Sequence, residues 1–206
     1  MAPGVRTVAV LLLAVCAAVT LYIVDDVVES NFAKTHPEKT YLIGDQKFKI
    51  PKRYVSVFWP SQHDIIVLWA MFPNLSPVPR ACGKTDTCDK IVSFYLSTEP
   101  VAPVSKQWGG MFEDPATKEG PGPFGLIEYH NAKWTRFTDI YGKTLQTGEF
   151  YSVFCNRFPN SINNCTSYEQ FSKSVSLRIE FRRSQLKDWE QIHTSILALI
   201  SSFETE

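Results

Sequence analysis

The sequence predicts an α+β protein in which an N-terminal transmembrane helix precedes one domain. That domain is expected to be a mainly antiparallel sheet, arranged as a meander and packed by a C-terminal helix. Three observations lead to this prediction. Residues 7–24 form an uncharged, mostly aliphatic run, residues 174–183 alternate between apolar and polar side chains, and residues 186–203 carry apolar side chains at helical spacing.

The apolar run Thr7 to Val24 has the length of a membrane span. A helix rises about 1.5 Å per residue, so the run would extend over roughly 27 Å, close to the thickness of a bilayer's hydrocarbon core. Arg6 precedes the run, whereas Asp25 and Asp26 follow it. Because positive residues tend to stay on the cytoplasmic side, we expect a single-pass membrane protein with its N-terminus in the cytoplasm and its domain outside the cytoplasm.

A cleaved signal peptide is the alternative interpretation, with a cleavage site near Cys16 to Ala18. The continued apolar character up to Val24 favours the uncleaved anchor. The predicted organisation is a cytoplasmic tip at 1–6, a transmembrane anchor at 7–24, a linker at 25–40 and an extracytoplasmic α+β domain at 41–206.

Most of the domain is expected to form strands. Between Ser174 and Arg183, Val175 and every second residue up to Phe181 are apolar, so one face should lie in the core and the other in water. Short polar connections between successive strands favour antiparallel pairing. The other predicted strands are an edge strand at Lys47–Ile50, a central strand at Asp64–Phe72, Ile91–Leu96, a hairpin of Phe124–Tyr129 with Trp134–Ile140, and Glu149–Cys155.

The chain is predicted to end in an amphipathic helix. Ser184 is a suitable N-cap, and apolar side chains recur on one stripe from Leu186 to Phe203. Such a stripe normally packs against a sheet. A helix lying on a membrane would need more basic residues on its polar face than Lys187 alone supplies.

Four cysteines lie in the exported part, and an oxidising compartment favours disulfides between them. They are Cys82, Cys88, Cys155 and Cys165, while Cys16 lies unpaired in the anchor. Three pairings are possible, and the local pairs Cys82–Cys88 and Cys155–Cys165 are the simplest. Zinc is the rival explanation, but neither pair has the two-to-four-residue spacing typical of structural zinc sites.

The long connection from Glu99 to Pro123 is rich in proline and glycine, so no regular element is expected there. It nevertheless carries Trp108, Met111 and Phe112. One interpretation is that these side chains pin the connection onto the sheet. The other makes them partly exposed anchors for a partner, since aromatic and Met side chains are enriched in interface cores.

Nothing in the sequence predicts catalysis, a cofactor or a metal site. Known nucleophile, zinc-helix and phosphate-loop motifs are missing from the sequence. The one suggestive pair of catalytic side chains is Glu128 with His130, which are two residues apart and so lie on one face of a predicted strand. Polar residues are common at a hairpin end, so we expect no enzymatic role for this pair. The net charge of zero at pH 7 gives no argument for nucleic acid.

Two segments carry a resemblance to known families. With the N-terminal anchor, Phe48–Tyr54 resembles small envelope proteins of Gram-negative bacteria, and so does the ending from Leu186 to Phe203. Some of those are similar to immunity proteins encoded beside type VI secretion effectors. Strands followed by a last helix ending in Ser-Phe also resemble PsbP-like domains. The resemblance implies an antiparallel sheet with helices and, for the immunity family, a periplasmic inhibitor of a toxin. It also implies that the anchor lies in the inner membrane and the domain in the periplasm.

Three functions follow as hypotheses. The first is a membrane-anchored periplasmic binding protein, an immunity protein that occludes a secreted toxin through the region from Trp108 to Phe112. The second is a structural or assembly subunit of an envelope complex. The third, an envelope enzyme, has the least support. The partners expected from these hypotheses are the lipid bilayer, through residues 7–24, and another periplasmic protein.

Overall fold

The computed structural model describes residues 37–56, 64–79, 82, 88, 90–102, 104–158 and 165–205. The chain divides into two units, Met1–Lys39 and Thr40–Glu206. Of the first unit only residues 37–39 are described, so the fold reported below is that of the second.

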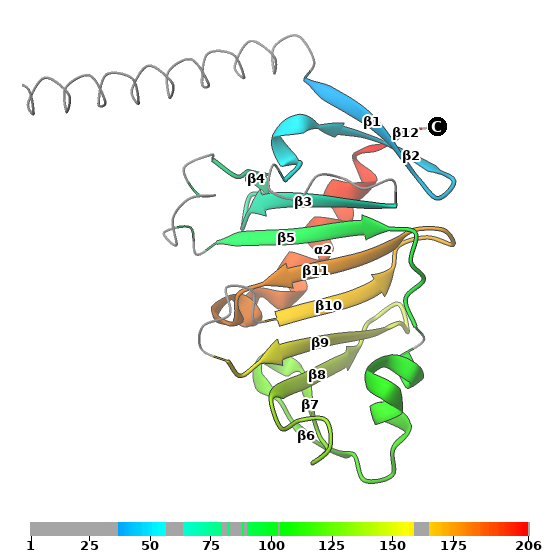
Figure 1. Ribbon diagram of the computed structural model, residues 1–206. Coiled ribbons are helices and arrows are strands. Elements are labelled where there is room, and N and C mark those ends of the chain that lie inside the picture. The colour runs from blue at the N-terminus through cyan, green and yellow to red at the C-terminus, as the bar shows by residue number, and fades with distance from the viewer. Residues whose placement is uncertain are drawn as a thin grey trace, which may run out of the picture. The chain divides into compact units, whose positions relative to one another are not determined.

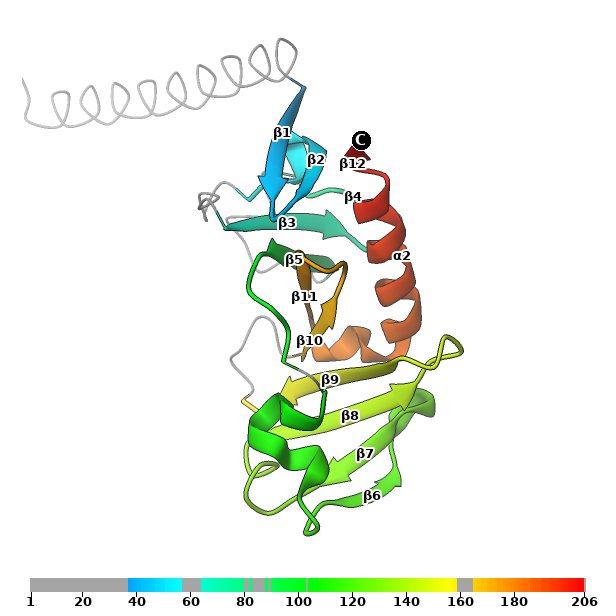
Figure 2. The ribbon, with the colours of Figure 1, turned by 90° about the vertical axis from the view of Figure 1, so that its right-hand side faces the viewer.

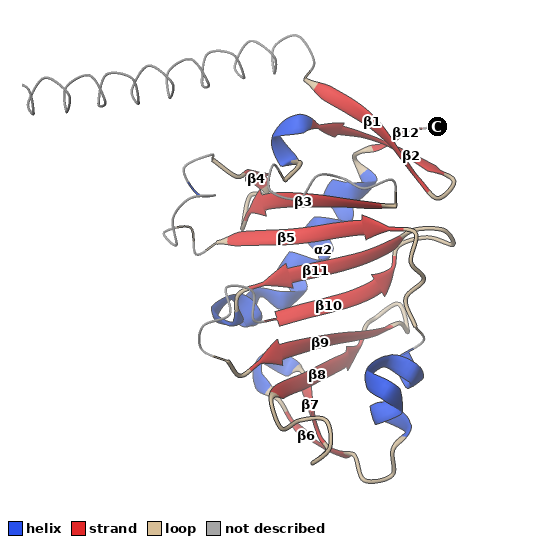
Figure 3. Ribbon diagram, in the orientation of Figure 1, coloured by secondary structure: helices blue, strands red, loops and turns tan. Residues whose placement is uncertain are grey.

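The second unit is built around a large antiparallel sheet (Figures 1 and 3). The described strands are β3 (Ile65–Met71), β4 (Ser76–Pro77), β5 (Ile91–Ser97), β6 (Lys118–Pro121), β7 (Ile127–His130), β8 (Thr138–Thr144), β9 (Phe150–Asn156), β10 (Cys165–Gln170) and β11 (Ser176–Phe181). Their order in the sheet is β4-β3-β5-β11-β10-β9-β8-β7-β6. The predicted strands are present with shifts of a few residues at their ends.

The sheet is not one continuous meander, which corrects part of the predicted fold class. From β6 to β11 each strand pairs with the next, but β5 pairs with β11, with Phe94 opposite Ile179. The chain therefore leaves β5 near the middle of the sheet and re-enters at the outer edge, β6. Only a long connection can make this crossing, and the segment between Ser97 and Lys118 provides it.

A second, three-stranded sheet has the order β1-β2-β12, from β1 (Glu38–Ile43), β2 (Gln46–Pro51) and β12 (Glu204–Thr205). The predicted edge strand at Lys47–Ile50 lies here. Phe48 pairs with Glu204, and the Lys49 amide donates to the Phe203 carbonyl at 2.7 Å. The end of the chain is thus held against a strand near its beginning.

The C-terminal helix α2 (Trp189–Ser201) runs along one face of the large sheet (Figure 2). Its buried side chains Ile192, Ile196 and Ile200 pack in one core cluster with Leu68 and Phe94 of the strands. The predicted start at Ser184 is wrong, because η5 (Arg183–Asp188), a 3₁₀ helix, precedes α2. Packing of the predicted apolar stripe against the sheet is confirmed.

The opposite face carries a smaller core under a helical segment that the sequence did not predict. η3 (Val104–Glu113) is a 3₁₀ helix, so the expectation of no regular element in 99–123 is wrong. Figure 2 shows η3 and α2 on opposite sides of the sheet. Met111 of η3 packs with Tyr129, Ile140 and Phe154 of the sheet. The proline-rich ends of the connection did not prevent a helix between them, because burial of this apolar cluster stabilises it.

The alternation in β11 is only half as predicted. Leu177, Ile179 and Phe181 are buried in the large core, but Ser176 and Glu180 on the other face are also buried. Glu180 accepts a hydrogen bond from the Tyr95 hydroxyl at 3.0 Å, on the neighbouring strand. The periodicity predicts that the row of side chains from Ser176 to Glu180 faces water. Long side chains from the adjacent strands, such as Tyr95, cover this row instead.

The predicted transmembrane helix at 7–24 lies outside the described residues, as do the tip at 1–6 and most of the linker at 25–40. Within the described ranges, no helix combines the length and apolar character needed to cross a membrane. The predicted fold class is corrected accordingly. The fold consists of mostly antiparallel sheet with one α-helix, at the C-terminus, among the described residues.

Candidate partner-binding surface

The segment predicted to bind a partner does not present a row of exposed anchors. The Met111 side chain is fully buried, so it cannot reach a partner while the fold is intact. Phe112 is half-buried and makes edge contacts with the rings of Tyr129 and Phe150, with centroids 5.0 and 5.5 Å apart. The side chain of Trp108 is outside what the structure describes. For Met111, the interpretation of a segment pinned onto the sheet is the correct one.

Both disulfides expected from the local spacing are present, Cys82–Cys88 and Cys155–Cys165. The second joins residues directly opposite each other on β9 and β10 and is completely buried. In the part of the chain that the structure describes, no three His, Cys, Asp or Glu side chains gather as a metal site would require.

Glu128 and His130 lie close together, as their placement on one strand predicts. The His130 Nε2 and Glu128 Oε2 atoms are 3.7 Å apart at the end of β7, and the His130 side chain is half exposed. A second pair is partly buried: His193 Nε2 of α2 lies 2.6 Å from Glu169 Oε2 of β10, and the His193 and Tyr151 rings are in a T-shaped arrangement. This pair binds α2 to the sheet.

The middle of the sheet face opposite α2 carries a compact polar cluster. The Arg178 guanidinium lies over the ring of Tyr95 and near that of Tyr168, at 4.8 and 5.7 Å from their centroids. It also pairs with Glu180. Burial, and then the negative charge of Glu180, raise the pKa of Tyr95 to about 12. Tyr95, Arg178 and Glu180 thus interact with one another across β5 and β11, although the buried Nε atom of Arg178 has no hydrogen-bond partner among the described residues.

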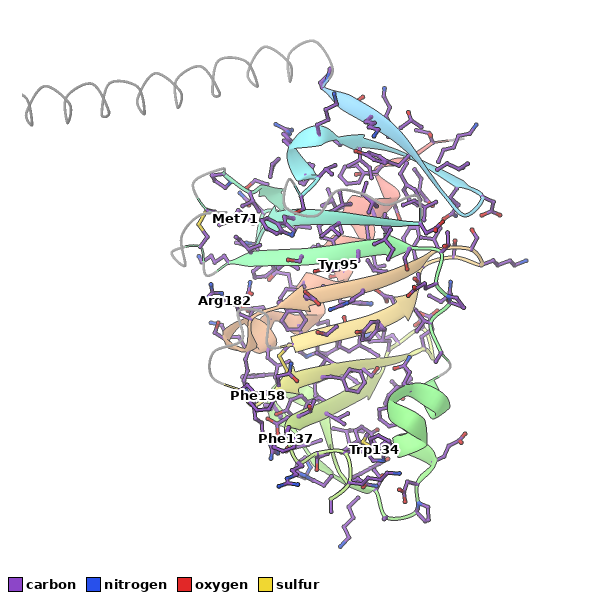
Figure 4. The ribbon with its side chains drawn as sticks, viewed as in Figure 1. Met71, Tyr95, Trp134, Phe137, Phe158 and Arg182 are labelled. Atoms are coloured by element: carbon purple, nitrogen blue, oxygen red, sulfur yellow. A yellow bond between two sulfur atoms is a disulfide. The ribbon has the colours of Figure 1, made fainter. Side chains whose placement is uncertain are left out.

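Exposed aromatic side chains gather where β8 begins and β9 ends, at the ends of two inner strands of the sheet. Phe137 and Phe158 are 51% and 55% exposed, and their rings stack with centroids 5.7 Å apart. Figure 4 shows both labelled side chains at these strand ends. Each follows an arginine, and the Arg136 guanidinium lies 5.0 Å from the centroid of the Phe137 ring. Two large apolar rings stacked in water are unusual unless another surface covers them.

A buried carboxylate belongs to Asp139, which lies two residues after Phe137 in the sequence and is paired with Cys155 of β9 in the sheet. Asp139 of β8 accepts a hydrogen bond from Arg157 Nε at 2.6 Å and pairs with Arg183 as well. Arg183 also donates to the Tyr141 hydroxyl at 3.3 Å. Burial alone would raise the pKa of the Asp139 carboxyl, but hydrogen bonds from the two arginines, together with their charges, lower that pKa below its usual value.

We call the set Phe137, Phe158, Arg136, Arg157 and Arg183 the Phe–Arg surface. The backbone connects its two halves, since the Arg157 amide donates to the Phe137 carbonyl at 3.0 Å. Sequence reasoning missed this surface because it placed Phe137 inside a strand. One signal was available: the dipeptide Arg-Phe occurs at 136–137 and again at 157–158, and antiparallel pairing of β8 with β9 brings the two copies together.

Exposed aromatic rings beside arginine are typical of protein–protein contact sites, in which Tyr, Trp, Phe and Arg are enriched. The Phe–Arg surface therefore has the composition of a contact site. Its rings supply apolar area, and its guanidinium groups supply hydrogen-bond donors with fixed geometry.

Comparison with solved structures finds a likeness to an immunity protein of the Stenotrophomonas maltophilia type IV secretion system. The two chains share 16% sequence identity with a TM-score of 0.61, over 82% of this chain and 94% of that chain. The likeness shows a shared fold, and it agrees with the resemblance to immunity proteins without supporting a type VI system or a PsbP-like domain specifically. No protein-family model matches this chain, and no curated protein matches it.

Proposed function

We propose that this protein is an immunity protein that binds a toxin delivered by a bacterial secretion system and occludes it. The observation that carries the proposal is the Phe–Arg surface, a solvent-exposed aromatic contact site on a fold shared with a secretion-system immunity protein. Exposed stacked rings cost free energy in water, and binding to a partner would recover it.

The proposed mechanism is steric. Phe137 and Phe158 insert into the toxin, and the rigid sheet behind them blocks access to its functional site. Phe137 and Phe158 lie just beyond the paired ends of β8 and β9, which are joined from Thr138–Asn156 to Thr144–Phe150, and the hydrogen bond from the Arg157 amide to the Phe137 carbonyl continues that pairing. A rigid surface loses little conformational freedom on binding, which favours high affinity.

We further propose that the domain works in the periplasm. Two disulfides support an oxidising compartment. Alkaline phosphatase fused after residue 206 should then be active in a bacterial host. An inactive phosphatase fusion, paired with a fluorescent cytoplasmic one, would contradict the periplasmic location. The type of secretion system is a separate question, which sequencing of the genes beside this one would answer. The structural neighbour belongs to a type IV system, whereas the resemblance in the sequence is to proteins of type VI systems.

The test starts from the genes beside this one, among which we expect one that encodes a secreted effector, and asks whether this chain neutralises that effector. The effector is directed to the periplasm of a host with and without this chain, and growth is followed together with co-elution of the purified proteins. We expect rescue of growth and a stable complex. Continued toxicity in the presence of the folded chain would overturn the proposal, and stable assembly with a secretion-apparatus protein instead would favour the envelope-subunit hypothesis.

A matched pair of variants connects the function to the surface. Replacing Phe137 and Phe158 with alanine should abolish neutralisation, because aromatic anchors carry much of an interface's binding energy. The control is Phe124→Ala, since Phe124 is 56% exposed but lies between β6 and β7. The control should neutralise the effector as well as the wild type does.

A further inference from the structure

We infer that the Phe–Arg surface recognises an acidic face of its protein partner, in which carboxylates surround an apolar pocket. The inference rests on the proposed function and names the chemistry of the toxin surface. Its starting point is a charge asymmetry. The whole chain has a net charge of zero, yet Arg136 lies over the exposed Phe137 ring, and Arg157 and Arg183 bind Asp139, two residues further along the chain.

The charges near the surface do not cancel. Asp139 is the carboxylate in contact with the arginines, and its side chain is only 7% exposed. Glu128 on β7 also acts electrostatically on Arg157, and its side chain is 24% exposed. Three guanidinium groups against the two carboxylates of Asp139 and Glu128 leave a surplus of one positive charge, and Arg136, Arg157 and Arg183 are the more exposed groups.

Asp139 positions two of the arginines before any partner arrives. The Arg157 and Arg183 side chains bind the same carboxylate while remaining 47% and 40% exposed. A guanidinium carries five N–H donors, and a contact with one carboxylate uses only some of them. The remaining donors have a fixed direction, which suits the carboxylates of a partner more than a mobile lysine would.

Arg136 joins the charged rim to the rings. It is exposed, and its guanidinium lies over the Phe137 ring. A partner that covers Phe137 must also cover Arg136 or place an acceptor beside it, because a guanidinium buried without a partner is costly. An apolar pocket rimmed by Asp or Glu meets both demands.

The first test measures affinity between this chain and the secreted effector encoded beside its gene, at low and high salt. Arg136→Glu should weaken binding at least about tenfold at low ionic strength, and the difference from wild type should shrink as salt screens the charges. The matched control is Arg53→Glu, since Arg53 is also exposed and lies 6.0 Å from the centroid of the Tyr54 ring. Arg53→Glu changes the net charge equally and should leave affinity within about twofold.

The second test separates positioning from net charge. Asp139→Asn removes a negative charge, so simple attraction to an acidic partner would tighten binding. If Asp139 instead positions Arg157 and Arg183, the variant should bind more weakly while a thermal melt shows that it is folded. Tighter binding would overturn the positioning role.

The outcomes distinguish this inference from the proposed function. If the wild type binds the effector, but Arg136→Glu and Arg53→Glu behave alike or salt has no effect, the acidic-face inference is wrong and the immunity role stands. If the wild type does not bind the effector at any salt concentration, the proposed function fails, and the inference fails with it.

Discussion

The fully buried Met111 allows the two interpretations of the connection before β6 to be separated quantitatively. Met111→Ala removes a side chain that is 0% exposed and packs on Tyr129, Ile140 and Phe154. Such truncations in cores cost about 2–5 kcal/mol. Because this cluster is small and η3 could partly close the gap, we expect a loss near the lower half of that range, about 3 kcal/mol. For a domain of this size the melting temperature should then fall by roughly 6–12 °C.

Urea denaturation of the purified domain provides the measurement. Met111→Leu is the control, since a swap that keeps the volume usually costs less than about 1.5 kcal/mol. At temperatures where Met111→Ala is folded, it should still bind the effector as the wild type does. The reasoning would be refuted by a Met111→Ala variant that keeps its full stability but loses the effector, because that result would make Met111 a binding residue.

Two further predictions concern the covalent and the ionisable parts of the fold. Replacing Cys155 and Cys165 with alanine should lower the free energy of unfolding by about 3 kcal/mol at most, because the stabilisation by a disulfide grows with loop length and this loop is short. Non-reducing peptide mapping should show this pair crosslinked in the wild type. A crosslinked Cys82–Cys155 peptide would contradict the assignment. Tyr95 should ionise near pH 12 in an ultraviolet titration. Because folding raises this pKa, the stability it contributes is complete below the unfolded value of about 10 and is lost as the pH rises towards 12. Tyr95→Phe should remove that alkaline loss, and an unchanged pH profile in the variant would contradict it.

Local sequence patterns predicted much of the fold because their causes are local. The alternation of Leu177, Ile179 and Phe181 reflects the two-residue period of a strand, and the stripe beginning at Leu186 reflects the period of a helix. The disulfide Cys155–Cys165 was predicted from the short separation of its cysteines along the chain, and the structure places the two opposite each other on β9 and β10.

The candidate site was not predictable in the same way. Met111 looked like an anchor and is buried, whereas Phe137 looked like a strand residue and is exposed. Both outcomes depend on which distant segment covers a side chain. η3 covers Ile140 and Phe154 in the smaller core, but Phe137 lies just before β8 and keeps half of its surface in water.

By itself, the sequence determined where most strands and the C-terminal helix lie, and it favoured the cysteine pairing that the structure has. These features follow from periodicity and from short separations along the chain. Only the tertiary structure decided that β5 pairs with β11 and that the two Arg-Phe dipeptides meet beside Asp139. Pairing across long separations depends on the total burial and hydrogen bonding of the assembled sheet, and no local window of residues contains that sum.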